Sequence, residues 1–169
     1  MSGEIVNRVA NSKLITFDLE DFFPEGERLV LDISDWLYEG FILKEKDFRA
    51  SVNQHQWDQY LNKYVAITCS SDAIIPSWAY LLISTHLAAF AKKFVVGDLD
   101  LLENVIFQEI ISTMSLEQFR NVPVIIKGCS NKKIPDTAYA LMCQRLVPIV
   151  SSLMFGEACS SVPLFKKKK

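Results

Sequence analysis

The pattern of apolar and polar residues predicts that strands and helices alternate through most of the chain. Short apolar runs, typical of strands buried on both faces, are separated by longer stretches with helical spacing. The predicted strands are residues 64–68, 94–96, 122–126 and 153–155. The predicted helices are residues 76–93, 99–119 and 135–147. This alternation is typical of an α/β fold with a mostly parallel sheet.

Two segments of the chain repeat one pattern. Residues 65–80 and 124–139 both run from an apolar stretch through Cys-Ser to a Pro that lies four residues before a Tyr. The interval from this Pro to a Gly is 21 residues in both copies, from Pro76 to Gly97 and from Pro135 to Gly156. We therefore predict two superposable βαβ repeats, 64–98 and 122–157, joined by a helix within 99–121.

The N-terminal third follows another pattern. Residues 13–23 alternate apolar and acidic side chains in part, a turn-like segment follows, and residues 28–33 form a second apolar run. We predict that the two runs pair as a β-hairpin. Residues 46–61 carry apolar side chains on one helical face, with a break near His55. This hairpin and helix, residues 1–63, begin a predicted single domain, 1–169, that ends in a loop and basic tail, 158–169.

Composition and charge restrict the classes of function. The net charge of −2 gives no electrostatic reason to expect a nucleic-acid partner. The most apolar stretch, residues 78–91, contains polar side chains and is shorter than the about 20 residues that cross a bilayer. The polar N-terminus does not resemble a secretory signal. We therefore expect a cytoplasmic protein without a membrane partner, whose four cysteines are free, metal-bound or redox-active.

Three of the cysteines share a local pattern. Cys69, Cys129 and Cys159 are each followed by Ser and, after a short loop, by Ile or Val and then Pro. Loops that follow parallel strands leave the sheet at one edge, where α/β sheets bind ligands, so we expect these loops to converge. Converging thiolates are ligands for zinc or iron, with Asp72 as the candidate fourth ligand. Cys143 lies in an apolar helical stretch instead, and we expect it to be buried.

Two other interpretations of the cysteines stay open. A thiol-dependent enzyme or sulfur carrier would use Cys129, because the lysine-rich loop around it favours a thiolate. Alternatively, the cysteines only pack at strand ends, and the chain is a non-catalytic interaction module. The apolar residues 36–38 are a candidate contact for a homodimer.

Several stretches resemble a known family over essentially the whole chain, including the three Cys-Ser loops. These stretches are residues 4–11, 17–22, 24–28, 43–49, 127–132 and 155–160. They are similar to an uncharacterised bacterial family, domain of unknown function 2480. The resemblance brings no established activity. It implies an accessory role in iron–sulfur cluster assembly or sulfur handling, with iron–sulfur assembly proteins as partners. The cofactor that we expect, zinc or iron (as an iron–sulfur centre), follows from the cysteine ligands described above.

Overall fold

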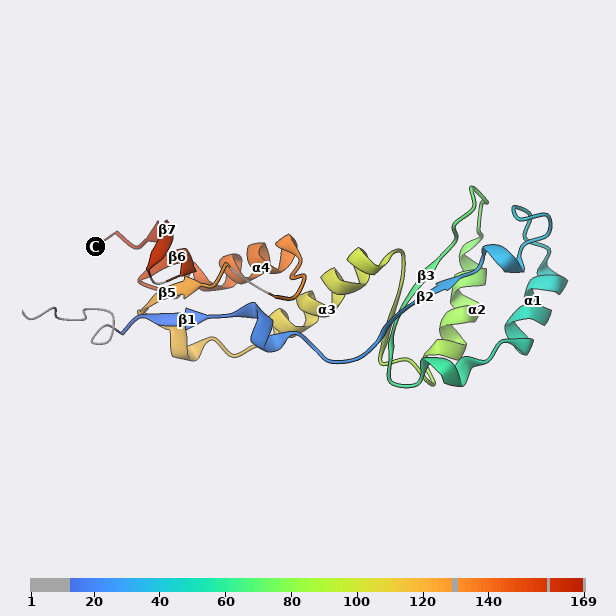
Figure 1. The fold of residues 1–169 in the computed structure, drawn as a ribbon, viewed down its shortest axis with the longest axis horizontal. Helices are drawn as coiled ribbons and strands as arrows, with labels where there is room; N and C mark the ends of the chain where they lie inside the picture. Colours follow the sequence, from blue (N-terminus) through green and yellow to red (C-terminus); the bar gives the residue numbers. More distant parts are fainter. Residues whose placement is uncertain (1–12, 129–130, 158, 169) are drawn as a thin grey trace, which may run out of the picture. The chain divides into compact units, whose positions relative to one another are not determined.

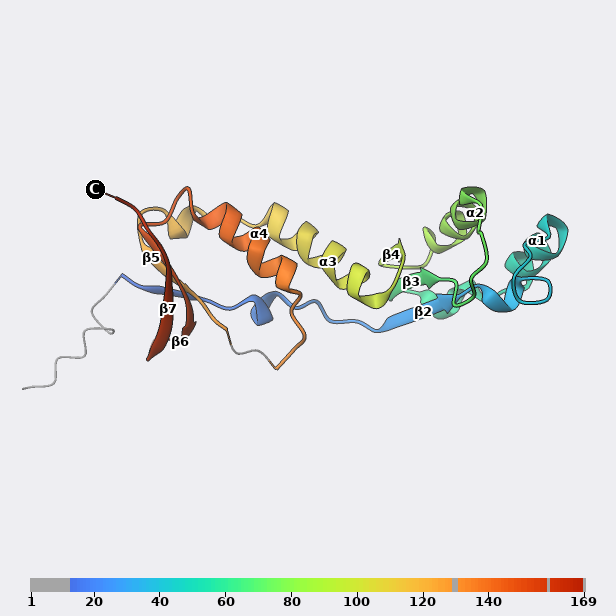
Figure 2. The ribbon, with the colours of Figure 1, turned by 90° about the horizontal axis from the view of Figure 1, so that it is seen from above.

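The structure is a computed structural model that describes residues 13–128, 131–157 and 159–168. The chain forms two compact units, each with its own sheet (Figures 1 and 2). Unit 2 is the continuous segment Pro24–Ile106. Unit 1 comprises the chain before it, up to Phe23, and the chain after it, from Phe107 onward.

Unit 2 contains a three-stranded parallel sheet in the order β2-β3-β4. Its strands are β2 (Arg28–Asp32), β3 (Tyr64–Thr68) and β4 (Lys93–Val96). Its helices are the 3-10 helix η2 (Ser34–Trp36), α1 (Glu45–Gln54), the 3-10 helix η3 (Trp57–Tyr60) and α2 (Ser77–Leu87). Alternate residues of β3, Val65 and Ile67, pack with Phe48 of α1 and Ile83 of α2 in the core of this unit.

Unit 1 contains a four-stranded sheet in the order β1-β5-β6-β7. The strands β1 (Ile15–Phe17), β5 (Pro123–Ile126) and β6 (Ser152–Glu157) are parallel, and β7 (Ser160–Lys166) is antiparallel to β6. The 3-10 helix η1 (Leu19–Phe22) follows β1, α3 (Leu99–Thr113) and the 3-10 helix η4 (Glu117–Phe119) precede β5, and α4 (Asp136–Leu146) joins β5 to β6. Helix α3 begins within unit 2 and ends within unit 1.

The predicted repeat is present, and it is longer than the sequence pattern indicated. Positions correspond at a constant spacing of 59 residues, from Phe48 and Phe107, which are both fully buried, to Gly97 and Gly156, which both have positive φ. The helices α2 and α4 are 11 residues each and follow proline N-caps with nearly the same backbone angles. The α/β fold class and the two βαβ repeats are therefore confirmed.

The turns before the second strand of each unit show the same correspondence. Asn62 and Asn121 adopt left-handed backbone conformations, with φ of 59° and 58°. The Asn62 amide donates to the carbonyl of Phe90 at 2.9 Å, and the Asn121 amide donates to the carbonyl of Ile149 at 2.7 Å. Asparagine tolerates this conformation better than most residues, which explains why both copies use it.

The predicted N-terminal hairpin is wrong. Strand β1 pairs with β5, where Phe17 lies opposite Ile126, and β2 pairs with β3, where Leu31 lies opposite Ile67. The two N-terminal runs are thus corresponding first strands of two different sheets. Each run pairs in parallel with a buried strand of its own unit, and this arrangement buries more apolar surface than a lone two-stranded hairpin would.

Three element boundaries also differ from the prediction. Helix α2 ends at Leu87 although its sequence has no proline there, and α3 ends at Thr113. Strand β7 occupies part of the segment that we expected to be a loop and tail. None of the helices in the described part of the chain has the length and apolar character needed to cross a membrane.

Candidate functional site

The carboxyl edge of the unit 2 sheet is organised by Asp32, the last residue of β2. Its Oδ1 accepts hydrogen bonds from the amides of Ser34, at 3.0 Å, and Ser70, at 3.1 Å. The Ser70 hydroxyl donates to the Ser34 hydroxyl at 3.0 Å. Hydrogen bonding from Ser70, and with it from Ser34, lowers the pKa of Asp32 to about 2. The carboxylate therefore fixes the loops that follow β2 and β3 against each other.

Unit 1 has the corresponding arrangement around Asp18, which follows β1. Asp18 Oδ1 accepts from the Glu20 amide at 2.9 Å, and its Oδ2 pairs with Lys127 Nζ at 2.7 Å. The hydrogen bond and charge of Asp18 raise the pKa of Lys127. Glu20 Oε2 accepts from the Asn131 amide at 2.9 Å. The loop after β5 is thus held by a charged pair, whereas the loop after β3 is held by neutral donors.

Cys69 and Cys143 pack against the cores of their units. Cys69 is half-buried in the unit 2 core, and its Sγ lies 3.3 Å from Ser71 Oγ. Cys143, on α4, is half-buried beside the unit 1 core, so the expectation of full burial is not met. These two thiols are side chains at packed positions.

Two of the other candidate ligands, Cys159 and Asp72, lie in loops. Cys159 is exposed in the turn between β6 and β7, and Asp72 is exposed in the loop after β3. Cys129 lies outside the described residues. Within residues 13–128, 131–157 and 159–168, no group of three or more His, Cys, Asp or Glu side chains could hold a metal ion.

The expected convergence of the three cysteine loops assumed a single sheet. Cys69 follows β3 of unit 2, whereas Cys159 follows β6 of unit 1. The strands belong to two separate sheets, so a shared sheet edge no longer supports the convergence. The three-cysteine ligand set, with Asp72, stays a prediction.

The constant spacing also shows that the cysteines of the two repeats do not correspond. Cys69 corresponds to Gly128, and Cys129 corresponds to Ser70. A Cβ atom on Gly128 would lie 2.9 Å from the ring of Phe155, whose counterpart in unit 2 is the smaller Val96. Unit 2 therefore has room for the Cys69 side chain at a position where unit 1 requires glycine. The shared Cys-Ser pattern arises from neighbouring positions of the loop.

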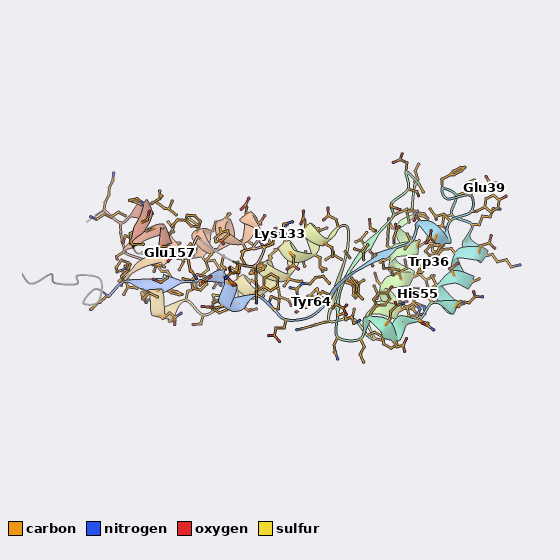
Figure 3. All side chains as sticks on the ribbon, viewed as in Figure 1. Trp36, Glu39, His55, Tyr64, Lys133 and Glu157 are labelled. Atoms are coloured by element: carbon orange, nitrogen blue, oxygen red, sulfur yellow. The ribbon has the colours of Figure 1, made fainter. Side chains whose placement is uncertain are left out.

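The loops at the carboxyl edge of unit 2 carry exposed apolar side chains. The loop after η2 and the loop after β3 project on the same side of this unit (Figure 1), and Figure 3 shows Glu39 at the tip of the first. Five apolar residues from these loops and from the end of β4 are at least 41% exposed: Tyr38, Phe41, Ile42, Ile74 and Val96. Only Tyr38 falls within the predicted dimer contact, because Trp36 and Leu37 are more buried.

The same segments are acidic. Residues 32–44, 68–76 and 96–101 contain six Asp or Glu and one basic residue, Lys44, whose Nζ lies 2.9 Å from the centre of the Tyr38 ring. Unit 2 as a whole has 12 acidic and 7 basic residues, a net charge of −5, whereas unit 1 has 8 and 11, a net charge of +3. We call the carboxyl-edge surface formed by these exposed apolar and acidic residues the acidic edge.

The fold and these loops define a two-unit α/β protein in which one βαβ scaffold occurs twice. The chain belongs to the family described as protein of unknown function (DUF2480), whose model matches residues 3–167. The resemblance found in the sequence is therefore confirmed. No curated protein and no solved structure matches the chain.

Proposed function

We propose that the protein is a non-catalytic interaction module that binds a partner protein at the acidic edge of unit 2. The observation that carries this proposal is that two loops held together at their start by Asp32 each expose apolar side chains. Ile74 is 93% exposed, and exposed apolar patches on soluble proteins commonly mark interaction sites. The half-buried Cys69 beneath this edge supports a packing role for that thiol.

The charge of the edge defines the chemistry of the partner. Six acidic residues accompany the apolar side chains, and a single lysine lies among them. A partner segment that combines apolar and basic side chains would bury the apolar groups and complement the charge. The family resemblance implies that the partner is an iron–sulfur assembly protein, and this identity is part of the proposal.

Site-specific photo-crosslinking in the cells that make the protein tests the binding surface. A photoreactive amino acid at Ile74, in the loop that leaves β3, should yield one defined adduct. The matched control is Leu61, which is 56% exposed in the segment that enters β3. The same photoreactive amino acid, placed at position Leu61 instead, should not yield this adduct. The proposal fails if both positions give the same adducts or if Ile74 gives none.

A second candidate function is a thiolate metal centre confined to unit 1. Strands β5 and β6 are parallel neighbours, with Ile126 opposite Phe155, and their carboxyl ends lead into Cys129 and Cys159. Two thiols that follow neighbouring strands are a starting point for a zinc or iron–sulfur site. A sulfur carrier that uses Cys129 as its reactive thiol would need the same region.

Metal analysis of anaerobically purified protein separates these cysteine hypotheses. A unit 1 centre predicts that Cys129→Ser and Cys159→Ser each release most of the metal, while Cys69→Ser and Cys143→Ser retain it. The three-cysteine set predicts that Cys69→Ser releases it as well. A thiol mechanism predicts that the protein holds no metal and that Cys129 accounts for most of its activity. If the protein holds no metal and all four variants have equal thiol reactivity, both the metal-centre and the thiol hypotheses are wrong.

A further inference from the structure

Units 1 and 2 carry different side chains at corresponding positions beside the last turns of α3 and α1. In unit 2 the side chain of Trp57 stacks on His86, with ring centres 4.8 Å apart, and His55 lies edge-on to the same indole. The corresponding residues of unit 1 are Leu116 for Trp57 and Arg145 for His86. Unit 1 thus replaces two stacked rings by a shorter aliphatic side chain and a guanidinium.

A hollow of about 360 Å³ is present at this place in unit 1. Its volume is within the range typical of small-molecule sites, about 300–1,000 Å³. Its lining is apolar at Met114, Leu116 and Ile149 and charged at Glu117, Arg120 and Arg145, with the hydroxyl-bearing Ser115 between them in sequence.

The charges in the hollow favour an anion. Arg120 pairs with both carboxylate oxygens of Glu117, at 2.9 and 3.2 Å, so these two charges offset each other. Arg145 contributes the remaining positive charge. Its Nη1 donates to the carbonyl of Ile111. A guanidinium has five N–H donors, so Arg145 can hold this carbonyl and bind a ligand at the same time.

We propose that this hollow binds a small organic anion that carries an apolar group. Arg145 would donate to the carboxylate or phosphate of the ligand, and the hydroxyl of Ser115, which also lines the hollow, would offer a further donor. The apolar group would lie against Leu116, which corresponds to Trp57 of unit 2, and against Ile149. This inference is independent of the proposed partner-binding edge, because it concerns other residues in the other unit.

Titration of the whole protein with phenyl phosphate, followed by NMR, tests the proposal. We expect saturable shifts of the Leu116 and Ile149 methyl signals. Inorganic phosphate, which has the charge alone, and benzyl alcohol, which has the ring alone, should each bind at least about tenfold more weakly. Benzoate should compete with phenyl phosphate, because a carboxylate offers the same acceptor pair to Arg145. The proposal is wrong if phenyl phosphate causes no saturable shift or binds no better than its parts.

Two variants separate the cavity from its charge. Leu116→Trp places the unit 2 side chain in the hollow and leaves Arg145 in place, so affinity should fall at least about tenfold. Arg145→His combined with Leu116→Trp reproduces both residues of unit 2 and should remove binding. Arg49→Gln, which changes an exposed arginine of α1, is the control and should bind like the parent. Unchanged affinity in Leu116→Trp, or shifts at His86 and Trp57 instead, would overturn the assignment.

Discussion

Helices α1 and α3 occupy corresponding places in units 2 and 1, but different side chains bond to their last turns. Trp57 Nε1 donates to the carbonyl of Val52 at 2.9 Å. In unit 1 the corresponding carbonyl, that of Ile111, accepts from Arg145 Nη1. Carbonyls at a helix C-terminus need a partner outside the helix, and each unit supplies one from a different element.

The comparison shows that the scaffold and its surface chemistry vary separately. Backbone features recur at the spacing of 59 residues, including the proline N-caps, the left-handed asparagines and the buried phenylalanines. The side chains that fill the ends of the sheets differ, and so do the net charges of the units. One unit presents an acidic, apolar edge, and the other presents a hollow with a guanidinium.

The first experiment tests this comparison by removing the buried phenylalanine ring that each unit has at the corresponding position. Phe48→Ala and Phe107→Ala each delete a fully buried ring and should each lower the free energy of unfolding by about 3–5 kcal/mol. Urea denaturation of both variants measures the effect. A loss below about 1 kcal/mol in one variant alone would show that the two positions are not equivalent.

The second experiment exchanges the side chains beside the last helical turn. Trp57→Leu removes a ring stack and the hydrogen bond to Val52, and should lower the free energy of unfolding by about 2–3 kcal/mol. Adding His86→Arg gives unit 2 the arginine that unit 1 has at the corresponding position. This second change should restore at least about 0.5 kcal/mol of the free energy of unfolding, which a double-mutant cycle in urea measures. Additive losses in the cycle would mean that Arg145 does not replace the indole as a partner of the helix carbonyl.

The third experiment concerns Gly128 and Phe155 of unit 1, which correspond to Cys69 and Val96 of unit 2. Gly128→Ala places a Cβ 2.9 Å from the Phe155 ring and should cost about 1–2 kcal/mol. The same change should cost less in a Phe155→Val background, because valine is the residue at the corresponding position of unit 2. Thermal unfolding of the four proteins checks this, and an equal cost in both backgrounds would contradict it.

The smallest expected effect is on the acid stability of unit 2. Asp32 has a folded-state pKa of about 2, whereas an unfolded aspartate titrates near pH 4. Its contribution to stability is therefore present above about pH 4 and is lost as the pH falls toward about 2. Asp32→Asn should reduce stability at pH 7, and the difference from the parent should shrink as the pH falls through about 2. Asp35→Asn, which removes a carboxylate at an exposed neighbouring position, is the matched control variant.

Periodicity predicted the elements well because buried parallel strands and helices each leave a regular pattern. The spacing between Pro76 and Gly97, repeated from Pro135 to Gly156, was enough to predict both βαβ repeats. The pairing of β1 and β2 was mispredicted because sequence neighbours joined by a turn resemble a hairpin. A signal was present, since Phe17-Asp-Leu and Leu31-Asp-Ile are similar and mark corresponding strand ends.

The candidate site was less predictable than the fold. The Cys-Ser pairs in two loops looked like a repeated site. The two repeats align at a constant spacing of 59 residues, however, and this alignment places Cys69 opposite Gly128. Asp32 and Asp18 were not predicted as the residues that fix the loops, because their partners lie on segments distant in sequence. The hollow beside Arg145 was not predicted, because its lining combines residues just after α3 with Arg145 of α4 and Ile149, which lie about 30 positions further along the chain.

A crystal structure of the chain soaked with phenyl phosphate tests the central claim most directly, namely that one scaffold occurs twice and differs in what it can bind. We predict that residues 48–97 superpose on residues 107–156 without a gap, and that the ligand lies beside Arg145 in unit 1, with its ring against Leu116. The corresponding place in unit 2 should be filled by Trp57 and His86. A shift of register between β5 and β6, or ligand bound at His86 instead of Arg145, would contradict the account.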